Sequence, residues 1–232
     1  KIYSVHPYKW RSMMLKRLYI DNFRCLVNFE LKLDPINLLL GANGSGKTSV
    51  FDVLRRLQDF LIGDFRVHDV FLVSDLTLWQ TGGRQRFEFE VSAGDDLYTY
   101  RLLLERESDR RRMRVFEERL DLNDKPLFHC KNGMAQLYRD DHAPGPEYPF
   151  DWSLSAVGAL HERPDNQKLT RFKHDLAKLI VVRPIPILME RESRGEQERL
   201  SHRMENFVSW YRHLAQEYMG AMIALLSELK AV

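Results

Sequence analysis

The chain has 232 residues, 44% of them hydrophobic and 29% charged, with a formal net charge of +2. This length allows one large or two small domains with a well-filled core. The balanced charge argues against binding nucleic acid through bulk charge, so any basic surface has to be local. Two separated cysteines, Cys25 and Cys130, make no disulfide framework. Together with the lack of an apolar span or a secretory signal, this indicates a cytoplasmic protein without a membrane segment.

The first part of the chain begins with strand patterns and then turns helical. Residues 15–23 alternate as in a half-buried strand, and residues 30–33 are expected to form a second, short strand. Ile36 to Leu40 are apolar without alternation, which is typical of a strand buried on both faces of a parallel sheet. An amphipathic run then predicts a helix over 47–61, ended by Gly63.

The loop between that strand and that helix reads Gly41-x-x-x-x-Gly46-Lys47-Thr48, the spacing of a phosphate-binding loop. Its glycines let successive backbone N–H groups point inward, and the helix N-terminus favours a polyphosphate further. Lys47 is expected to reach the β- and γ-phosphate oxygens and to stabilise charge in the transition state, and Thr48 to bind Mg²⁺. The nucleotide-binding residues predicted from the loop are Gly41, Asn43, Gly44, Ser45, Gly46, Lys47, Thr48 and Ser49.

A β-rich block follows the helix and the ambiguous residues 64–81. Phe87 to Val91 alternates and is expected to pair with 97–104 in a hairpin through a four-residue connection, 93–96. The Asn132-Gly133 pair is a strong turn signal. The other strands expected in this antiparallel meander cover 113–122, 127–130 and 135–138.

The remaining sequence is mostly helical. Residues 140–151 are rich in Pro, Gly and Asp and are expected to be a loop or subdomain boundary. Phe207, Trp210 and Tyr211 have helical spacing, which is typical of a core or of an interface with a partner helix. Helices are predicted over 153–161, 168–178 and 200–229, the last broken near Gly220, with a short strand over 180–182. The expected divisions are an N-terminal extension over 1–14, a nucleotide-binding lobe over 15–139 and a helical subdomain over 140–232.

The stretches LYIDNFRC and NLLLGANGSGKTSVFDVL, followed by FEFEV and LYTYRLLL, resemble the N-terminal half of the RecF/SMC-like ABC-type ATPases. That group includes bacterial AAA family ATPases related to the overcoming-lysogenization-defect (OLD) nucleases. The resemblance implies an α/β P-loop NTPase fold: an ABC-ATPase-like first lobe with parallel core strands, an antiparallel β-meander and a C-terminal helical subdomain. It further implies ATP and Mg²⁺ as ligands, a homodimer or higher oligomer that sandwiches ATP, and DNA, a nuclease or a toxin as partner. Arg24, after the Asn-Phe pair, is implied to lie near the nucleotide, and a strand-end surface position is the other interpretation.

The chain also departs from that group's pattern. It contains neither the Leu-Ser-Gly-Gly signature nor an apolar strand ending in Asp-Glu, the Walker B motif that supplies the catalytic acid. The sequence VFLVSD ends at Asp75, for which an ordinary strand-end or cap role is the better interpretation and a metal role the weaker one. The catalytic residues are therefore unknown apart from Lys47, and the chain is expected to stop before the signature and Walker B half.

Two functions remain open at this stage. The first is an ATPase that couples Mg–ATP binding to a conformational output in DNA repair or phage defence. The second is an ATP-gated binding or scaffold module with little hydrolysis of its own, and a small-molecule P-loop kinase is a weaker third option. The basic run 105–114 fits a DNA-contacting surface, although its interleaved acids favour a solvated hairpin tip.

Overall fold

The computed structural model describes residues 13–107 and 112–229. By the density of their internal contacts these separate into a unit that ends at Leu179 and a unit that begins at Ile180. The sequence placed a division near residue 140, whereas these compact units divide at residue 179. The predicted N-terminal extension lies outside the described residues, apart from residues 13 and 14.

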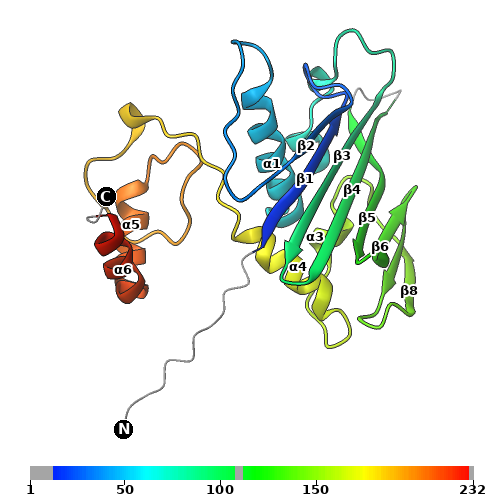
Figure 1. Ribbon diagram of the computed structural model, residues 1–232. Helices are drawn as coiled ribbons and strands as arrows, with labels where there is room; N and C mark the ends of the chain where they lie inside the picture. The colour runs from blue at the N-terminus through cyan, green and yellow to red at the C-terminus, as the bar shows by residue number, and fades with distance from the viewer. Residues whose placement is uncertain (1–12, 108–111, 230–232) are drawn as a thin grey trace. The chain divides into compact units, whose positions relative to one another are not determined.

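The first unit is built on one eight-stranded sheet in the order β2-β1-β3-β4-β5-β6-β7-β8 (Figure 1). Every neighbouring pair in this sheet is antiparallel. The strands are β1 (Met14–Asp21), β2 (Phe29–Lys32), β3 (Arg84–Ala93), β4 (Asp96–Arg106), β5 (Met113–Leu122), β6 (Lys125–Lys131), β7 (Met134–Tyr138) and β8 (Pro144–Pro149). The helices of this unit are α1 (Lys47–Ile62), α2 (Val67–Val70), α3 (Ala156–Ala159) and α4 (Gln167–Ala177), with a 3₁₀ turn η1 (Val73–Asp75).

The core lies between one face of the sheet and the helices. Alternation places Leu18 and Ile20 of β1 on this face, where both side chains are fully buried. The ring of Phe172 on α4 packs on the rings of Phe89 and Tyr98, with centroids 6.0 and 5.5 Å apart. Helix α1 buries its apolar stripe here, and Gly63 follows its last turn as predicted. The buried residues of this stripe are Val50, Val53, Leu57, Phe60 and Leu61.

The predicted parallel core strand over 36–40 is wrong for the described chain. These residues form no strand, and the side chains of Ile36, Leu38 and Leu40 are 91%, 79% and 81% exposed. A buried parallel strand needs parallel neighbours on both sides. The chain instead leaves α1 through α2 and η1 and enters β3, which pairs with β1 in antiparallel orientation. Among the described residues, the segment therefore has no strand partner.

The meander agrees with the sequence except in two places. Its turns at Asn132 and Gly133 have positive φ angles of 51° and 77°, as a two-residue hairpin turn requires. The β3–β4 connection is shorter than predicted, because Ala93 pairs with Asp96 and leaves only two residues in the turn. The segment predicted as a loop over 140–151 contains the edge strand β8, whose prolines are tolerated because its outer side needs no hydrogen-bond donors.

The second unit holds a 3₁₀ turn η2 (Pro186–Leu188) and two helices, α5 (Phe207–Glu217) and α6 (Met219–Leu229). The predicted break in the helical run exists, but it falls at Tyr218 rather than at Gly220. The ring of Phe207 lies 5.9 Å from that of Trp210 and 6.2 Å from that of Tyr211, so the aromatic stripe packs on itself. Residues 180–182 form no strand, contrary to the prediction.

Candidate nucleotide-binding site

The phosphate loop is an open turn at the start of α1. Gly46 occupies the N-cap position of α1 with φ = 92°, and Gly44 has φ = 82°. Both angles lie in the left-handed region, where a side chain is strained, so glycine is needed at these two positions. A Cβ on Gly44 would meet no atom within 4 Å, which leaves free space on that side of the loop.

Lys47 is folded over the loop that precedes it. Its Nζ donates to the carbonyl oxygens of Gly41 and Ala42 at 2.6 and 2.7 Å and approaches Ser45 Oγ at 3.4 Å. These contacts are exposed, and phosphate oxygens bind an ammonium group more strongly than neutral carbonyls do. The lysine is thus positioned to exchange loop carbonyls for a phosphate.

The next two residues of α1 differ in exposure. Thr48 is exposed, whereas Ser49 is buried, at 8% of its full exposure. Only the Thr48 hydroxyl is therefore openly presented beside the loop. Asn43 and Ser45 are exposed as well, and the backbone N–H of Ser45 donates to the carbonyl oxygen of Ala42 at 3.3 Å.

A tight turn between β1 and β2 supports the loop from behind. Phe23 and Leu26 exchange two backbone hydrogen bonds of 3.0 and 2.8 Å. A Cβ on Gly46 would lie 2.8 Å from Leu26 Cδ2 and 2.9 Å from Cys25 Sγ. The turn over residues 23–26 therefore lies directly against the backbone of the phosphate loop, and a side chain at position 46 would separate the two.

Arg24 ties this turn to the rest of the unit. Its Nη1 donates to Asp52 Oδ2 on α1 at 2.7 Å, and its Nε donates to Asp75 Oδ1 on η1 at 3.1 Å. Its own backbone N–H donates to the Asp75 carbonyl at 2.6 Å. Burial alone would lower the pKa of Arg24, but the hydrogen bonds to the two carboxylates outweigh this, so its pKa is raised.

Asp75 is a structural anchor in this arrangement. Arg56 of α1 donates to Asp75 Oδ2 at 2.7 Å, and the backbone N–H of Leu72 donates to the same oxygen at 3.1 Å. With Arg24 on its other oxygen, the carboxylate of Asp75 is fully used by the protein. The cap interpretation from the sequence is confirmed by the Leu72 hydrogen bond. Asp52 and Arg56, which complete the cluster, were not singled out from the sequence, because no local pattern marks partners so distant along the chain.

Comparisons with known proteins match the part of the chain that contains this loop. The AAA ATPase domain family matches residues 13–96. The OLD nuclease of Thermus scotoductus is 39% identical over 71 residues, covering 28% of this chain and 13% of that protein. The RecF protein of Cronobacter sakazakii, a DNA replication and repair protein, is 52% identical over 91 residues, covering 35% of this chain and 24% of RecF.

Residues 13–96 are thus similar to the AAA ATPase domain family, and this part of the chain is similar to RecF and to the OLD nuclease. A solved structure of RecF bound to ATP shares 21% identity at a TM-score of 0.36 and covers 53% of this chain and 30% of that one. The chain spans only about an eighth to a quarter of the length of the curated relatives named above. The P-loop NTPase fold implied by the resemblance is supported by the family match, while its parallel core strands are not.

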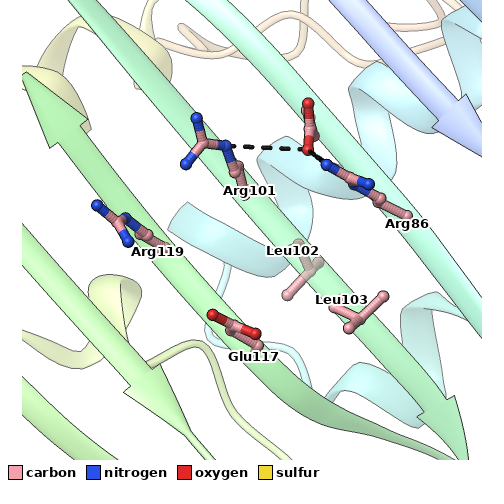
Figure 2. Close-up of a pocket in the computed structure, with 7 residues that line it drawn as sticks. Arg86, Arg101, Leu102, Leu103, Glu117 and Arg119 are labelled. Atoms are coloured by element: carbon pink, nitrogen blue, oxygen red, sulfur yellow. Dashed lines mark hydrogen bonds and ion pairs between the residues drawn. The ribbon is translucent and has the colours of Figure 1, made fainter. Parts of the chain in front are cut away.

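The first unit has a groove on the outer face of its sheet. The groove has a volume of about 300 Å³ and is lined by residues of β3, β4 and β5. Figure 2 shows these side chains, with helices behind the strands. Arg86 and Arg101 both pair with Glu88, and Arg101 and Arg119 both pair with Asp121. Because each guanidinium already faces a carboxylate, the groove is charge-balanced and is no match for a polyphosphate.

Within the described residues, no three His, Cys, Asp or Glu side chains gather closely enough to hold a metal ion on their own. No described helix has the length and apolar character that crossing a bilayer requires. Part of the basic run 105–114 lies outside the described residues. In the part that is described, Arg114 donates to Glu105 at 2.8 Å, so at least this arginine is neutralised locally.

Proposed function

We propose that this chain binds Mg–ATP at the phosphate loop and belongs to an ATPase that couples nucleotide binding to a conformational output. The observation that carries the proposal is the loop itself: two glycines in left-handed conformation, a lysine folded over the loop, and a helix that starts at its end. Backbone N–H groups, the helix N-terminus and the ammonium then converge on one exposed space.

Each residue of the loop has a distinct part in this proposal. The backbone N–H groups over residues 43–46 hold the phosphates, and Lys47 neutralises the β- and γ-phosphate oxygens. The exposed hydroxyl of Thr48 would hold Mg²⁺, and the metal would supply positive charge against the phosphates. Ser49 is buried and serves the loop through its backbone N–H.

The acid that activates the attacking water is not among the residues gathered at this loop. The carboxylate of Asp75 already accepts hydrogen bonds from two arginines and from the backbone N–H of Leu72. The exposed apolar segment 36–40 supports the view that further strands join beside the loop, since such a segment is costly in water. We therefore place the signature and Walker B motifs in residues outside this chain, with two copies sandwiching two nucleotides.

The biological output is proposed from the relatives alone. RecF is named for DNA replication and repair and OLD for its nuclease. These names support our proposal that the output is DNA repair with DNA or a nuclease as partner, while phage defence and a toxin partner are proposed from the sequence resemblance.

A second candidate is an ATP-gated binding or scaffold module that barely hydrolyses ATP. It is favoured by Asp75, whose carboxylate is already occupied by Arg24, Arg56 and the backbone N–H of Leu72. The two candidates share the binding site and differ only in turnover.

The test is to measure Mg–ATP binding and phosphate release by the 232-residue chain, with Lys47→Ala as the control. Lys47 makes only exposed contacts within the loop, so the variant should unfold like the wild type. We expect the wild type to bind ATP and the variant to bind at least about tenfold more weakly, as loss of a charged hydrogen bond predicts. Binding without turnover is the result expected when the water-activating acid lies outside this chain, whereas turnover by this chain alone, lost in Lys47→Ala, would contradict that placement. Equal binding by both proteins would refute the phosphate-loop assignment.

A further inference from the structure

The cluster behind the phosphate loop joins three segments through four charged side chains. Arg24 comes from the β1–β2 turn, Asp52 and Arg56 from α1, and Asp75 from η1. The side chains of Asp75 and Arg56 are only 7% and 11% exposed, and those of Asp52 and Arg24 are 23% and 35% exposed. The cluster is thus buried at the η1 end and open to solvent on the side of Asp52.

The hydrogen bonds fix the orientation of the Arg24 guanidinium. Nε and Nη1 are held by different carboxylates on different elements, so the plane of the group has little freedom to rotate. The cation also lies over the ring of Phe23, with Cζ 5.1 Å from the ring centre, and Arg56 lies over the same ring at 5.4 Å. Phe23 itself is fully buried, which anchors the start of the turn in the core.

The fixed position of Arg24 supports the phosphate loop. The backbone of Arg24 is left-handed, with φ = 52°, a conformation that an arginine keeps only when its surroundings hold it there. Asp52 and Asp75 keep Arg24 in this conformation through their hydrogen bonds to its guanidinium. The next two residues, Cys25 and Leu26, are the ones in contact with Gly46. Releasing Arg24 would therefore loosen the support beneath the phosphate loop.

We propose that Asp52 and Asp75 are positioning residues of the nucleotide site, which act through Arg24 to press the turn over residues 23–26 against Gly46. This inference rests on the proposed function, because its consequence is a phosphate loop that is organised before the nucleotide arrives. Arg56 balances the second carboxylate, so that Asp75 can serve Arg24 without an unpaired buried charge.

The test compares ATP affinity among variants of the full chain, using a fluorescent ATP analogue with Mg²⁺. We expect Asp52→Asn and Arg24→Ala each to raise Kd about three- to tenfold, as for a partly exposed ion pair with good geometry. The double variant should bind ATP no more weakly than Arg24→Ala alone, because both changes remove the same Arg24–Asp52 ion pair. Asp59→Asn is the matched control: it removes a carboxylate paired with Arg55 on the same helix, at 2.6 Å, and should change Kd less than about twofold.

A second readout reports the turn without any nucleotide. Cys25 is exposed and touches the loop, whereas Cys130 is buried and serves as the internal reference. The rate of alkylation of Cys25 should change in Asp52→Asn and Arg24→Ala in the same direction, and stay at the wild-type value in Asp59→Asn. A general loss of stability would raise the reactivity of Cys130 too, which separates positioning from unfolding.

The outcomes are distinguishable. If the wild type fails to bind ATP, the proposed function fails and the positioning role falls with it. If the wild type binds but Asp52→Asn leaves both Kd and Cys25 reactivity unchanged, only the positioning role is overturned. The positioning role is also overturned if the effects of Arg24→Ala and Asp52→Asn multiply, since independent effects contradict a shared link.

Discussion

Gly46→Ala is the substitution whose cost the structure specifies best. At φ = 92° a side chain costs about 1–2 kcal/mol in backbone strain. The new methyl would also lie 2.8 Å from Leu26 Cδ2 and 2.9 Å from Cys25 Sγ. Leu26 is 4% exposed and cannot swing outward, so this crowding should add about 1–3 kcal/mol. We expect the free energy of unfolding to fall by about 2–5 kcal/mol.

Gly44→Ala separates the two contributions. Its φ of 82° imposes the same kind of strain, but its Cβ would meet nothing within 4 Å, so the expected loss is only about 1–2 kcal/mol. Urea unfolding of both variants and the wild type measures the difference. Leu26→Ala in the Gly46→Ala background should cost less than it does in the wild type, because it makes room for the methyl. Equal losses for the two glycine variants would refute the contact between the turn and the loop.

Two further predictions concern buried polar groups. Asn22 donates to the carbonyl oxygens of Gly82 and Arg84, both at 2.7 Å, so Asn22→Ala should lower the free energy of unfolding in urea by about 2–4 kcal/mol. Asn28 also has a positive φ but is exposed, so Asn28→Ala should lower it by less than about 1 kcal/mol. Similar losses for the two variants would contradict the role of these buried hydrogen bonds. Burial raises the pKa of Glu118, so the folded chain binds its proton more tightly than the unfolded chain does. This stabilisation is complete below the pKa that Glu118 has in the unfolded chain, and it is lost as pH rises through the folded pKa. Across that range wild-type stability should fall relative to Glu118→Gln in urea unfolding, and a pH-independent difference would contradict this.

The parts of the fold that local patterns determine could be predicted from the sequence. Alternation and the Asn132-Gly133 turn located the meander, and the amphipathic run over 47–61 located α1 to within one residue of its end. These signals work because hairpins and helix faces are decided by residues close together in the chain. The strand β8 was missed for the opposite reason, since Pro144 and its fellow prolines argue against a strand unless the position is known to be an edge.

The features that depend on distant partners could not be predicted. The apolar character of 36–40 indicates burial, but whether a neighbouring strand is present is not encoded in those five residues. In the site, the loop glycines and Lys47 follow from a local motif, whereas Arg24, Asp52 and Asp75 meet only after folding. No spacing rule links positions that lie on a turn, a helix and a 3₁₀ segment.

The strand order has a consequence for how the chain folds. From β3 to β8 each strand pairs with the next one along the described chain, so this part can form as a series of short hairpin closures. The β1–β3 pairing is different, because the connection between these strands contains β2, the phosphate loop and α1. Its closure carries the largest entropic cost in the sheet. The phosphate loop lies inside the segment that this pairing closes, so the closed sheet at β1 and β3 also brackets the loop.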